Sequence, residues 1–438
     1  MENIKLQKYP TYKPSGVEWL GEIPEHWGVT RVKNIFRLVV EPAPKNNDFE
    51  LLSVYTDIGV KPRAELEERG NKASTTDGYW FVKKGDIVVN KLLAWMGAIG
   101  VSNYDGVTSP AYDILRAKVQ LESNFYHYLF RNEACVSELR KHSRGIMDMR
   151  LRLYFDKFGN VLIPFPNYLE QQKIVAFLES KTALIDKAIA LKQKQIELLK
   201  ERRQILIHRA VTRGLNPDVK LKNSGVEWIG EIPEHWEVKK LGYLANCFPS
   251  NVDKHSKINE RQVRLCNYTD VYKNDYITDE MELMLATASE EQINKFSLQK
   301  GDIVITKDSE TASDIAVPTY IKEDLTNVVC GYHLAMIRVY QKSYSKYLFR
   351  ALQTKLFNVQ FEVCSNGITR VGLGSSDLKN GYFLVPSEHE QIQIADYIEL
   401  GTSKISTAIS LKEKEIEKLK EYKSVLINEA VSGKIKVG

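Results

Sequence analysis

Two long stretches of the chain, residues 169–210 and 389–430, place mostly apolar residues at steps that alternate between four and three. In the first stretch these positions are Leu178, Thr182, Ile185, Ile189, Lys192, Ile196, Leu199, Arg203 and Leu206. In the second they are Ile398, Thr402, Ile405, Ile409, Lys412, Ile416, Leu419, Lys423 and Leu426. A 3.5-residue period held over four heptads predicts a coiled-coil seam, and two helices with one pattern are expected to pair with each other. An amphipathic helix packed on its own domain is the alternative.

Composition and boundaries also favour helices in both stretches. Neither contains proline, and both are rich in Leu, Ile, Lys and Glu, which favour helix formation. Each stretch follows a proline, Pro166 or Pro386, and its pattern is lost at a glycine, Gly214 or Gly433. Proline before a helix and glycine after it are start and stop signals. The sequence therefore predicts one long helix in each half of the chain.

The segments in front of these helices have a different texture. They are rich in Gly, Pro and Tyr, and they contain the runs "GDIVV" at 85–89 and "GDIVIT" at 301–306, in which a Gly-Asp turn leads into a predicted strand. We therefore expect an α+β fold, with two mixed α/β globular domains separated by two long helices that pair as an antiparallel coiled coil. The expected boundaries are 1–167 and 217–387 for the globular domains, and 168–216 and 388–438 for the spacer helices.

The two halves of the chain are copies of one another. Residues 15–27 and 224–236 agree at 12 of 13 positions, in the sequences "SGVEWLGEIPEHW" and "SGVEWIGEIPEHW". Further matches follow in the same order, namely "KKGDIVVNK" with "QKGDIVITK" and "EQQKIVAFL" with "EQIQIADYI". A repeating unit of about 220 residues is too long for a solenoid repeat. It indicates tandem duplication of a domain with its helix, and an antiparallel helix pair would relate the copies by an approximate two-fold axis.

Length and composition fit a protein of two or more domains without a membrane span. At 438 residues the chain exceeds one ordinary core, and no apolar run approaches the ~20 residues that cross a bilayer. The N-terminus has no apolar signal core, which favours a cytoplasmic location. The five cysteines are scattered and odd in number, as for reduced thiols. The net charge of +5 permits a polyanionic partner without demanding one.

Signatures of catalysis are missing from the sequence. There is no GxxxxGKS or GxxxxGKT phosphate loop, no GxSxG elbow and no HExxH, and the eight histidines show no ligand spacing, so neither a catalytic residue nor a metal site is expected. His26 and His235 stand beside Trp27 and Trp236 in the repeated motif, and we expect them to pack at a domain edge. The pattern indicates a protein that positions other molecules and does not transform them.

The chain resembles the specificity subunits of type I restriction–modification systems. The resemblance is carried by the "SGVEW" opening of each half, the "GDIV" runs, the "SRGI" and "SNGITR" segments, and the proline that leads into the "EQQKI" and "EQIQI" helices. The helix ends "HRAVTRGL" and "NEAVSGKI" also fit, and the order of parts agrees over almost the whole chain. The resemblance implies that each globular domain is a target-recognition domain for one half of a bipartite site in double-stranded DNA.

The resemblance also implies the partners. The two helices would set the gap between the half-sites and dock two methyltransferase (modification) subunits, and restriction subunits with motor and nuclease activity would join them. S-adenosylmethionine, ATP and Mg would bind to those partners, and this chain would hold no cofactor. Two other hypotheses stay open: a non-catalytic coiled-coil scaffold for protein partners, and a divergent single-chain DNA methyltransferase or nuclease.

The segments that follow the "GDIV" strands differ in length and chemistry between the copies, as expected if the two domains read different bases; neutral loop drift is the alternative. Cations supply phosphate contacts, short polar side chains read base edges, and glycine lets the backbone approach a phosphate. The candidate DNA-binding residues are Lys91, Trp95, Arg140, Lys141, Arg144, Gly145, Arg150 and Arg152 in the first half, and Lys307, Ser309, Thr311, Tyr332, His333, Asn366, Gly367, Thr369 and Arg370 in the second. A core position for Trp95 and a solvated helix face for Arg140 and Lys141 are the alternatives.

Overall fold

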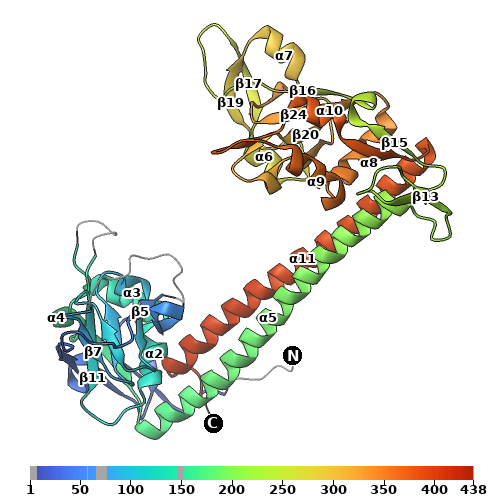
Figure 1. The fold of residues 1–438 in the computed structure, drawn as a ribbon. Helices are drawn as coiled ribbons and strands as arrows, with labels where there is room; N and C mark the ends of the chain where they lie inside the picture. Colours follow the sequence, from blue (N-terminus) through green and yellow to red (C-terminus); the bar gives the residue numbers. More distant parts are fainter. Residues whose placement is uncertain (1–6, 57, 66–75, 146–150, 438) are drawn as a thin grey trace. The chain divides into compact units, whose positions relative to one another are not determined.

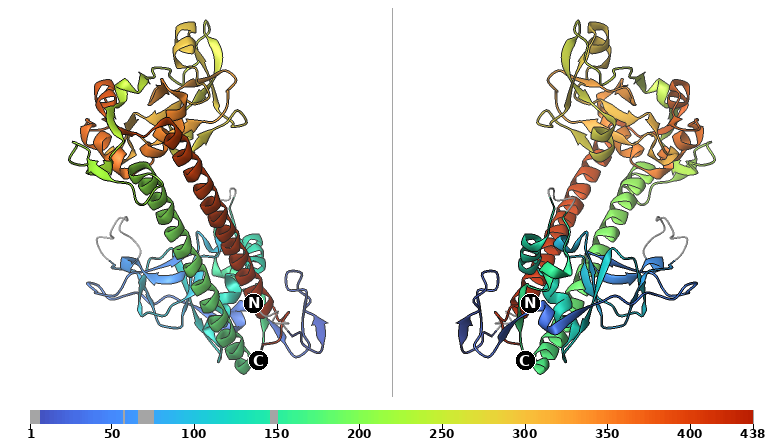
Figure 2. Two further views of the ribbon diagram at one scale, coloured as in Figure 1. Left: turned by 90° about the vertical axis from the view of Figure 1, so that its right-hand side faces the viewer. Right: turned by 90° about the vertical axis from the view of Figure 1, so that its left-hand side faces the viewer.

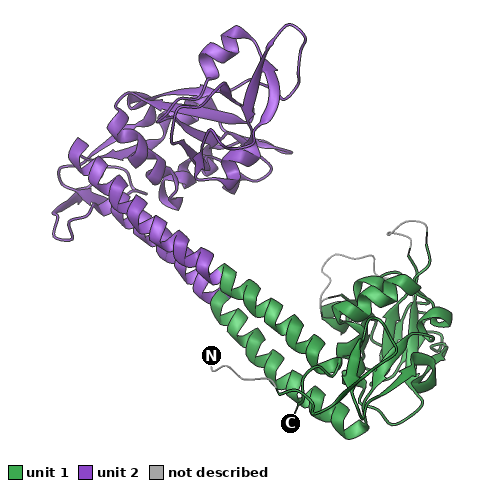
Figure 3. Ribbon diagram, turned by 180° about the vertical axis from the view of Figure 1, so that it is seen from behind, with its two compact units in different colours: residues 1–192, 413–438 green, residues 193–412 purple. Residues whose placement is uncertain are grey.

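The computed structural model of the chain describes residues 7–56, 58–65, 76–145 and 151–437. The chain forms two compact units (Figure 3): unit 1 holds residues 1–192 and 413–438, and unit 2 holds residues 193–412. Each unit contains one globular domain and a segment of both long helices. The predicted α+β class with an internal repeat is confirmed.

Two helices, α5 and α11, correspond to the heptad stretches (Figure 1). Helix α5 spans Tyr168–Arg213 and helix α11 spans Glu388–Val431. Each begins two residues after a proline, and each is followed by a left-handed glycine, Gly214 at φ +73° and Gly433 at φ +74°. Glycine adopts this conformation without strain and commonly ends a helix. The predicted start and stop signals are confirmed.

The two long helices run antiparallel within each unit. In unit 1, Lys192 Nζ lies 2.5 Å from Glu415 Oε2, and Lys423 Nζ donates to Asp186 at 2.7 Å. A lower residue number on α5 is therefore paired with a higher residue number on α11, as in an antiparallel pair. Figure 2 shows both helices from two further sides. The predicted antiparallel coiled coil is confirmed.

The heptad positions line this pairing. In unit 2, Leu206 of α5 lies so close to Gly401 of α11 that an added Cβ on the glycine would be 2.7 Å from its Cδ1. Along both helices the heptad positions are buried or half-buried, while most positions between them are exposed. The buried members are Leu178, Thr182, Ile185, Ile196, Ile398, Thr402, Ile405, Ile416, Leu419 and Leu426, and the half-buried members are Ile189, Lys192, Leu199, Arg203, Leu206, Ile409, Lys412 and Lys423.

A four-stranded antiparallel sheet forms the centre of the domain in unit 1, in the order β4 (Phe36–Val39), β11 (Tyr112–Ala117), β8 (Ile87–Asn90) and β9 (Ile99–Val101). The strand predicted at "GDIVV" is β8, and all four of its residues are buried. The other strands are β1 (Tyr12–Pro14), β2 (Glu22–Pro24), β3 (Gly28–Arg31), β5 (Leu52–Tyr55), β6 (Gly59–Pro62), β7 (Trp80–Val82), β10 (Gly106–Thr108) and β12 (Leu162–Phe165). The short helices are α1 (Val32–Ile35), η1 (Arg63–Glu65), η2 (Ala94–Met96), α2 (Ser123–Phe130), α3 (Glu133–His142) and α4 (Phe155–Phe158).

The domain in unit 2 has the equivalent sheet with one further strand, in the order β16 (Ala245–Pro249), β24 (Leu334–Val339), β20 (Ile303–Thr306), β22 (Pro318–Ile321) and β18 (Tyr276–Ile277). The strand predicted at "GDIVIT" is β20, again fully buried. The other strands are β13 (Leu221–Asn223), β14 (Glu231–Pro233), β15 (Glu237–Lys240), β17 (Arg261–Cys266), β19 (Met284–Ala288), β21 (Asp308–Ser309), β23 (Val328–Cys330), β25 (Val371–Gly372) and β26 (Tyr382–Val385). The helices are η4 (Leu241–Tyr243), α6 (Tyr268–Lys273), α7 (Glu290–Phe296), η5 (Ala312–Asp314), α8 (Lys342–Leu352), α9 (Lys355–Cys364) and α10 (Ser375–Asn380).

The two domains repeat one plan element by element. In unit 1 the strand β11 of the central sheet is followed by the helices α2, α3 and α4. In unit 2 the corresponding strand β24 is followed by the helices α8, α9 and α10. The strand before each long helix pairs with the strand after the opening motif, β12 with β3 and β26 with β15. Unit 2 has the three-stranded sheet β19-β17-β23, which shares an apolar cluster with main-sheet residues such as Val304 and Met336, where unit 1 has the pair β5-β6 among its described residues. The frame is therefore constant between the copies, and the inserted segments vary.

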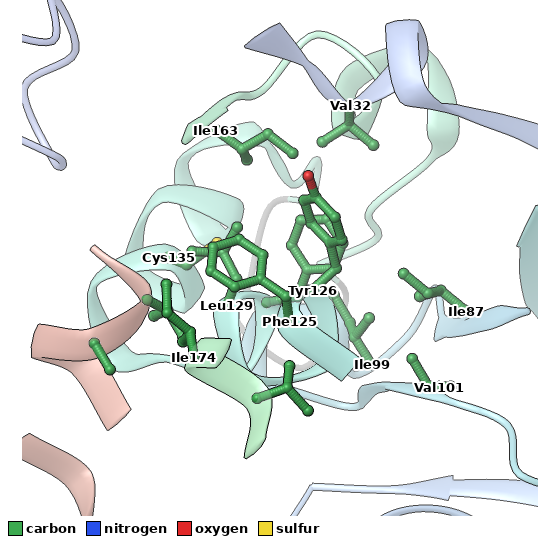
Figure 4. Packing of buried hydrophobic residues seen from close by; sticks show 14 of the residues in the cluster. Val32, Ile87, Ile99, Val101, Phe125, Tyr126, Leu129, Cys135, Ile163 and Ile174 are labelled. Carbon is green, nitrogen blue, oxygen red and sulfur yellow. The ribbon is translucent and has the colours of Figure 1, made fainter. Parts of the chain in front are cut away.

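The core of unit 1 joins the domain to its long helix (Figure 4). Phe125 and Leu129 of α2, Cys135 of α3 and Ile174 of α5 belong to one cluster, and each is 0% exposed. Because the first turns of α5 contribute to the domain core, the helix and the domain are expected to unfold together.

The Gly-Asp turns before β8 and β20 are built around buried ion pairs. Asp86, 3% exposed, accepts from Arg116 Nε and Nη2 at 2.8 and 2.7 Å. Asp302, 2% exposed, accepts from the same two atoms of Arg338 at 2.8 and 2.6 Å. The arginine side chains are 21% and 31% exposed, so removing either arginine leaves an unpaired buried carboxylate. The repeated Asp therefore ties the turn to the neighbouring strand, a role that its position in a turn did not predict.

The repeated opening motif joins the domain of unit 1 to both long helices. Trp27 is fully buried against the end of α11, where an added Cβ on Gly433 would lie 3.0 Å from the indole. His26 Nε2 lies 2.9 Å from a carboxylate oxygen of Glu170, in the first turn of α5. We call this pair of contacts, one to each helix, the tryptophan clamp.

Unit 2 contains the second tryptophan clamp with the helices exchanged. Trp236 is fully buried, 3.3 Å from the Cβ that Gly214 would carry at the end of α5. His235 Nε2 lies 2.9 Å from Glu390, in the first turn of α11. The structural role predicted for these histidines and tryptophans is confirmed.

Candidate nucleic-acid interface

Three segments of the second half that are far apart in sequence meet beyond the end of β20. Strand β21 pairs with β25, so residues 308–309 lie beside residues 371–372. The backbone N–H of Lys307 donates to His333 O at 2.8 Å, and Leu373 N–H donates to Lys307 O at 2.9 Å. The structure thus brings together the candidate residues of 307–311, 332–333 and 366–370.

A chain of polar contacts runs through this cluster. Lys307 Nζ donates to Asp308 Oδ2 at 2.8 Å, and His333 Nδ1 lies 3.3 Å from the same oxygen. On the other side of the ring, His333 Nε2 lies 3.0 Å from Arg370 Nη1. Burial lowers the pKa of His333, and the charge of Arg370 lowers it further. The hydrogen bond to Asp308 acts in the opposite direction and raises this pKa.

The remaining candidates of unit 2 surround this chain. Tyr332, 45% exposed, stands against His333 with ring centroids 3.6 Å apart, and Asn366, Gly367 and Thr369 are exposed. Gly367 has φ +149°, and an added Cβ there would lie 1.9 Å from Arg370 O. Only glycine fits this position, so the tight turn that presents Arg370 depends on it.

Two tyrosines that the sequence did not single out support the loop after β20. Tyr268 and Tyr272 of α6 stack with centroids 5.6 Å apart. Tyr268 Oη lies 3.0 Å from Ser309 Oγ, and Tyr272 Oη donates to Asp314 at 3.1 Å. Asp314 also accepts from Thr311 Oγ1 at 2.7 Å. Ser309 is buried and Thr311 is exposed, so Thr311 is the one of these two candidates that lies at the surface.

The equivalent region of unit 1 has the same backbone connections. Lys91 N–H donates to Ala111 O at 3.2 Å and Leu153 N–H donates to Lys91 O at 3.0 Å. Arg144 and Arg152 exchange two backbone hydrogen bonds of 2.9 and 2.8 Å, as Asn366 and Gly372 do in unit 2 at 3.1 and 2.9 Å. The chain is thus bridged at the same point after α3 and after α9.

The cations of unit 1 differ in their surroundings. Arg144 is exposed and 3.7 Å from Asp156, and Lys141 lies 3.0 Å from Glu138 on its own helix. Arg152, half-buried, donates to Leu151 O, and Gly145 is exposed. Arg150 lies outside the described residues.

The loop after β8 presents apolar side chains. Leu92, Leu93 and Met96 are 38%, 40% and 51% exposed. Trp95 is half-buried, with its Nε1 donating to Leu92 O at 3.0 Å and the guanidinium of Arg140 5.3 Å from its ring centroid. We call Leu92, Leu93 and Met96 the apolar knuckle, a group of residues that no sequence motif marks as DNA-binding.

Lys91 and Lys307 are both engaged inside their own domains. Lys91 Nζ donates to Pro110 O at 2.8 Å and lies 3.4 Å from Asp113, and both lysine side chains are 20% exposed. Burial raises the pKa of Asp113 although the lysine opposes this. These two lysines therefore neutralise carboxylates at the start of each loop.

Comparison with known proteins identifies the family. Residues 24–201 and 233–421 match the family model described as type I restriction modification DNA specificity domain. The chain belongs to this family. With two DNA specificity domains, it is a DNA-recognition specificity subunit.

Relatives of this specificity subunit extend over nearly its whole length. It is 23% identical over 429 residues to the MjaVIII type I restriction enzyme specificity subunit of Methanocaldococcus jannaschii, covering 95% of this chain and 94% of the relative. It is 24% identical over 449 residues to the MjaIX specificity subunit of the same organism, covering 95% of both chains. The EcoKI specificity subunit of Escherichia coli K12 matches at 23% over 248 residues, 55% of this chain and 51% of the relative.

Solved structures share the fold of the specificity subunit. A chain from a study of complex assembly and conformational transition of the type I R-M system superimposes with a TM-score of 0.69 at 13% identity, over 93% of this chain and 98% of that chain. The HsdS subunit from Thermoanaerobacter tengcongensis gives a TM-score of 0.52 at 14% identity, over 94% and 98%. Within the described ranges, no helix is both long and apolar enough to span a membrane, and no His, Cys, Asp and Glu side chains gather as a metal-binding group.

Proposed function

We propose that each globular domain of this specificity subunit reads one half of a bipartite site in double-stranded DNA. One observation carries the proposal: the same backbone frame, with the same hydrogen bonds at Lys91 and Lys307, presents different side chains in the two copies. A constant frame positions a protein on the DNA backbone, whereas side chains that differ change the bases that are read.

The chemistry of the two loops suits the major groove in different ways. The apolar knuckle of unit 1 offers contacts to thymine methyl groups. Arg140, against the ring of Trp95 in the same loop, and the exposed Arg144 offer cations for phosphates. In unit 2 the exposed Arg370, Thr369 and Asn366 offer hydrogen bonds to base edges.

The helices are the proposed docking surface for two methyltransferase subunits. Helix α5 carries exposed apolar residues at seven-residue spacing on the side away from the seam: Leu184 and Leu191 in unit 1, and Leu198 and Ile205 in unit 2, which are 52–60% exposed. An amphipathic helix of a partner protein recognises such a row through its own apolar face. Surface residues of this kind, repeated in register, favour a protein partner over solvent.

In this proposal the chain itself performs no catalysis. S-adenosylmethionine, ATP and Mg belong to the methyltransferase and restriction subunits, and the complex acts on DNA in the cytoplasm. The absence of nuclease or methyltransferase signatures in the sequence supports this division of labour.

The test is a domain exchange followed by methylation-site mapping with the partner methyltransferase. Residues 1–167 are replaced by the corresponding domain of another specificity subunit. We expect one half-site to change and the other half-site and the gap to stay the same. A change in both half-sites would contradict the assignment of one half-site to each domain, and an unchanged site in a folded, assembled complex would contradict the DNA-reading role of residues 1–167.

A further inference from the structure

The contact between Arg370 and His333 fixes the protonation of the imidazole. A guanidinium carries only donors, so the 3.0 Å contact to His333 Nε2 requires an unprotonated nitrogen there. The proton of the neutral ring then sits on Nδ1, which faces Asp308 Oδ2 at 3.3 Å and donates to it. Asp308, His333 and Arg370 thus form a directed chain from a carboxylate to an arginine, which we call the arginine relay.

The relay is held at its base and exposed at its end. Asp308 and His333 are 19% and 23% exposed, and Lys307 donates to the same Asp308 oxygen at 2.8 Å. Gly372 of β25 packs on Asp308, with an added Cβ 3.0 Å from Oδ1. Arg370 is exposed at the surface. One of its nitrogens is occupied by the imidazole, and the rest of the guanidinium is available for a ligand.

We propose that Asp308 and His333 are positioning residues that aim Arg370 at a base of the half-site read by unit 2. This inference rests on the proposed function, and it names side chains for the specificity of one half-site. An arginine side chain loses much conformational entropy when it contacts a base. Holding its guanidinium in place before binding reduces this loss and favours the correct contact. Arginine with two free donors pairs bidentately with the O6 and N7 acceptors of guanine.

Among the described residues of unit 1, the positions equivalent to Asp308 and His333 carry no such relay. The shared hydrogen bonds place Leu92 at the position of Asp308 and Ala111 at the position of His333. Neither side chain is able to orient an arginine by hydrogen bonding. The relay is therefore a property of one domain, and the half-site read by unit 1 serves as an internal control in the same complex.

The relay makes a prediction about pH. His333 faces the charges of Asp308, Lys307 and Arg370 and the ring of Tyr332. Protonation places a hydrogen on Nε2 opposite the Arg370 donor, so the contact breaks. Since the pKa of His333 lies below its usual value, the relay is intact at neutral pH and is lost as the pH falls through that pKa.

The test measures discrimination at each half-site. The full chain with its methyltransferase partner is titrated with duplexes carrying the mapped site, or the same site with single base pairs changed in one half. At pH 7.5 we expect Asp308→Ala and His333→Ala to reduce discrimination at one base pair of the unit 2 half-site about tenfold, as Arg370→Ala does, and to leave the unit 1 half-site unchanged.

The glutamine variant separates positioning from folding. In His333→Gln the amide oxygen accepts from Arg370 and the amide nitrogen donates to Asp308, and the group does not titrate. We expect this variant to keep discrimination at pH 7.5 and at every lower pH at which the complex stays folded, whereas the unmodified protein loses discrimination as the pH falls through the pKa of His333. Loss in His333→Ala without rescue in a folded His333→Gln would show that the ring only packs.

The outcomes also separate the relay from the proposed function. If Arg370→Ala relaxes one base pair while Asp308→Ala and His333→Ala do not, Arg370 acts alone and the relay is wrong. If none of the three variants changes discrimination although exchange of residues 217–387 changes the half-site, the domain reads DNA through other residues. If that exchange changes no half-site, the proposed function itself fails.

Discussion

The loops that follow β8 and β20 leave equivalent strands through the same backbone hydrogen bonds but carry opposite chemistry. The first exposes Leu92, Leu93 and Met96, and the second carries Asp308 and Thr311 on a loop held by two stacked tyrosines. The residues that hold the frame, Asp86 with Arg116 and Asp302 with Arg338, are the same in both. The comparison teaches that the duplicated motifs identify residues that hold the backbone in place. Residues that determine sequence specificity are expected in the loops, where the two copies differ.

The largest expected effect comes from lengthening the helix pair while leaving the sequences of both loops unchanged. Leu206 lies against Gly401, so one heptad earlier Leu199 faces Ala408 in the antiparallel pair. Inserting seven residues after each of Leu199 and Ala408 keeps the seam phase and lengthens the pair by about 10 Å. Methylation mapping is expected to show a gap longer by roughly three base pairs with unchanged half-site bases.

Three base pairs also turn one half-site by about 100° around the duplex, so weaker binding is expected at the new gap. Insertions of two residues at the same two places are the control, because they turn the seam positions by about 200° and should lower the thermal unfolding temperature. Methylation that persists at the original gap would contradict a spacer role for the helices.

The second prediction breaks the chemistry of one loop. In Leu92→Asp a carboxylate replaces part of the apolar knuckle, which removes an apolar contact and adds repulsion from the DNA phosphates. We expect DNA binding to weaken roughly tenfold. Discrimination between bases should fall at the unit 1 half-site and stay the same at the unit 2 half-site. Val119→Asp, at a side chain 43% exposed in the same domain, is the matched control. Equal losses in both variants would show a general charge effect.

The third prediction distinguishes a phosphate contact from a base contact. Arg144, exposed at the base of the unit 1 hairpin, is expected to bind a phosphate, so Arg144→Ala should flatten the log–log salt dependence of DNA binding by about one unit. Discrimination between sequences should not change, in contrast to Arg370→Ala. A salt dependence equal to that of the unmodified protein would place Arg144 outside the interface.

The smallest effect is expected at Lys91. Its ammonium group donates to Pro110 O and faces Asp113, and its side chain is 20% exposed. Lys91→Met should therefore leave the salt dependence of DNA binding unchanged and lower the free energy of unfolding by about 1 kcal/mol. A change in salt dependence as large as that of Arg144→Ala would return Lys91 to the DNA interface.

The long helices could be predicted from the sequence because a heptad pattern is local and repeats many times. The strands β8 and β20 could be predicted for the same reason, since each lies directly after its Gly-Asp turn. The relay could not, because Asp308 and His333 are 25 residues apart and His333 and Arg370 are 37 residues apart. They meet only in the folded domain, through the backbone bond from Lys307 to His333 and the pairing of β21 with β25. Tyr268 and Tyr272 stand 41 and 42 residues before their partners in the loop after β20, where no local spacing points to them.

The tryptophan clamp has a consequence for how such proteins are inherited. Each clamp uses the same thirteen-residue motif, and in both units its histidine meets a glutamate in the first turn of the following helix. A gene segment that encodes one domain together with its opening motif therefore also encodes the histidine and tryptophan that join that domain to the two helices. Recombination at these near-identical stretches would exchange one domain and keep the residues of its clamp, so we expect a new combination of half-sites to arise in a single event.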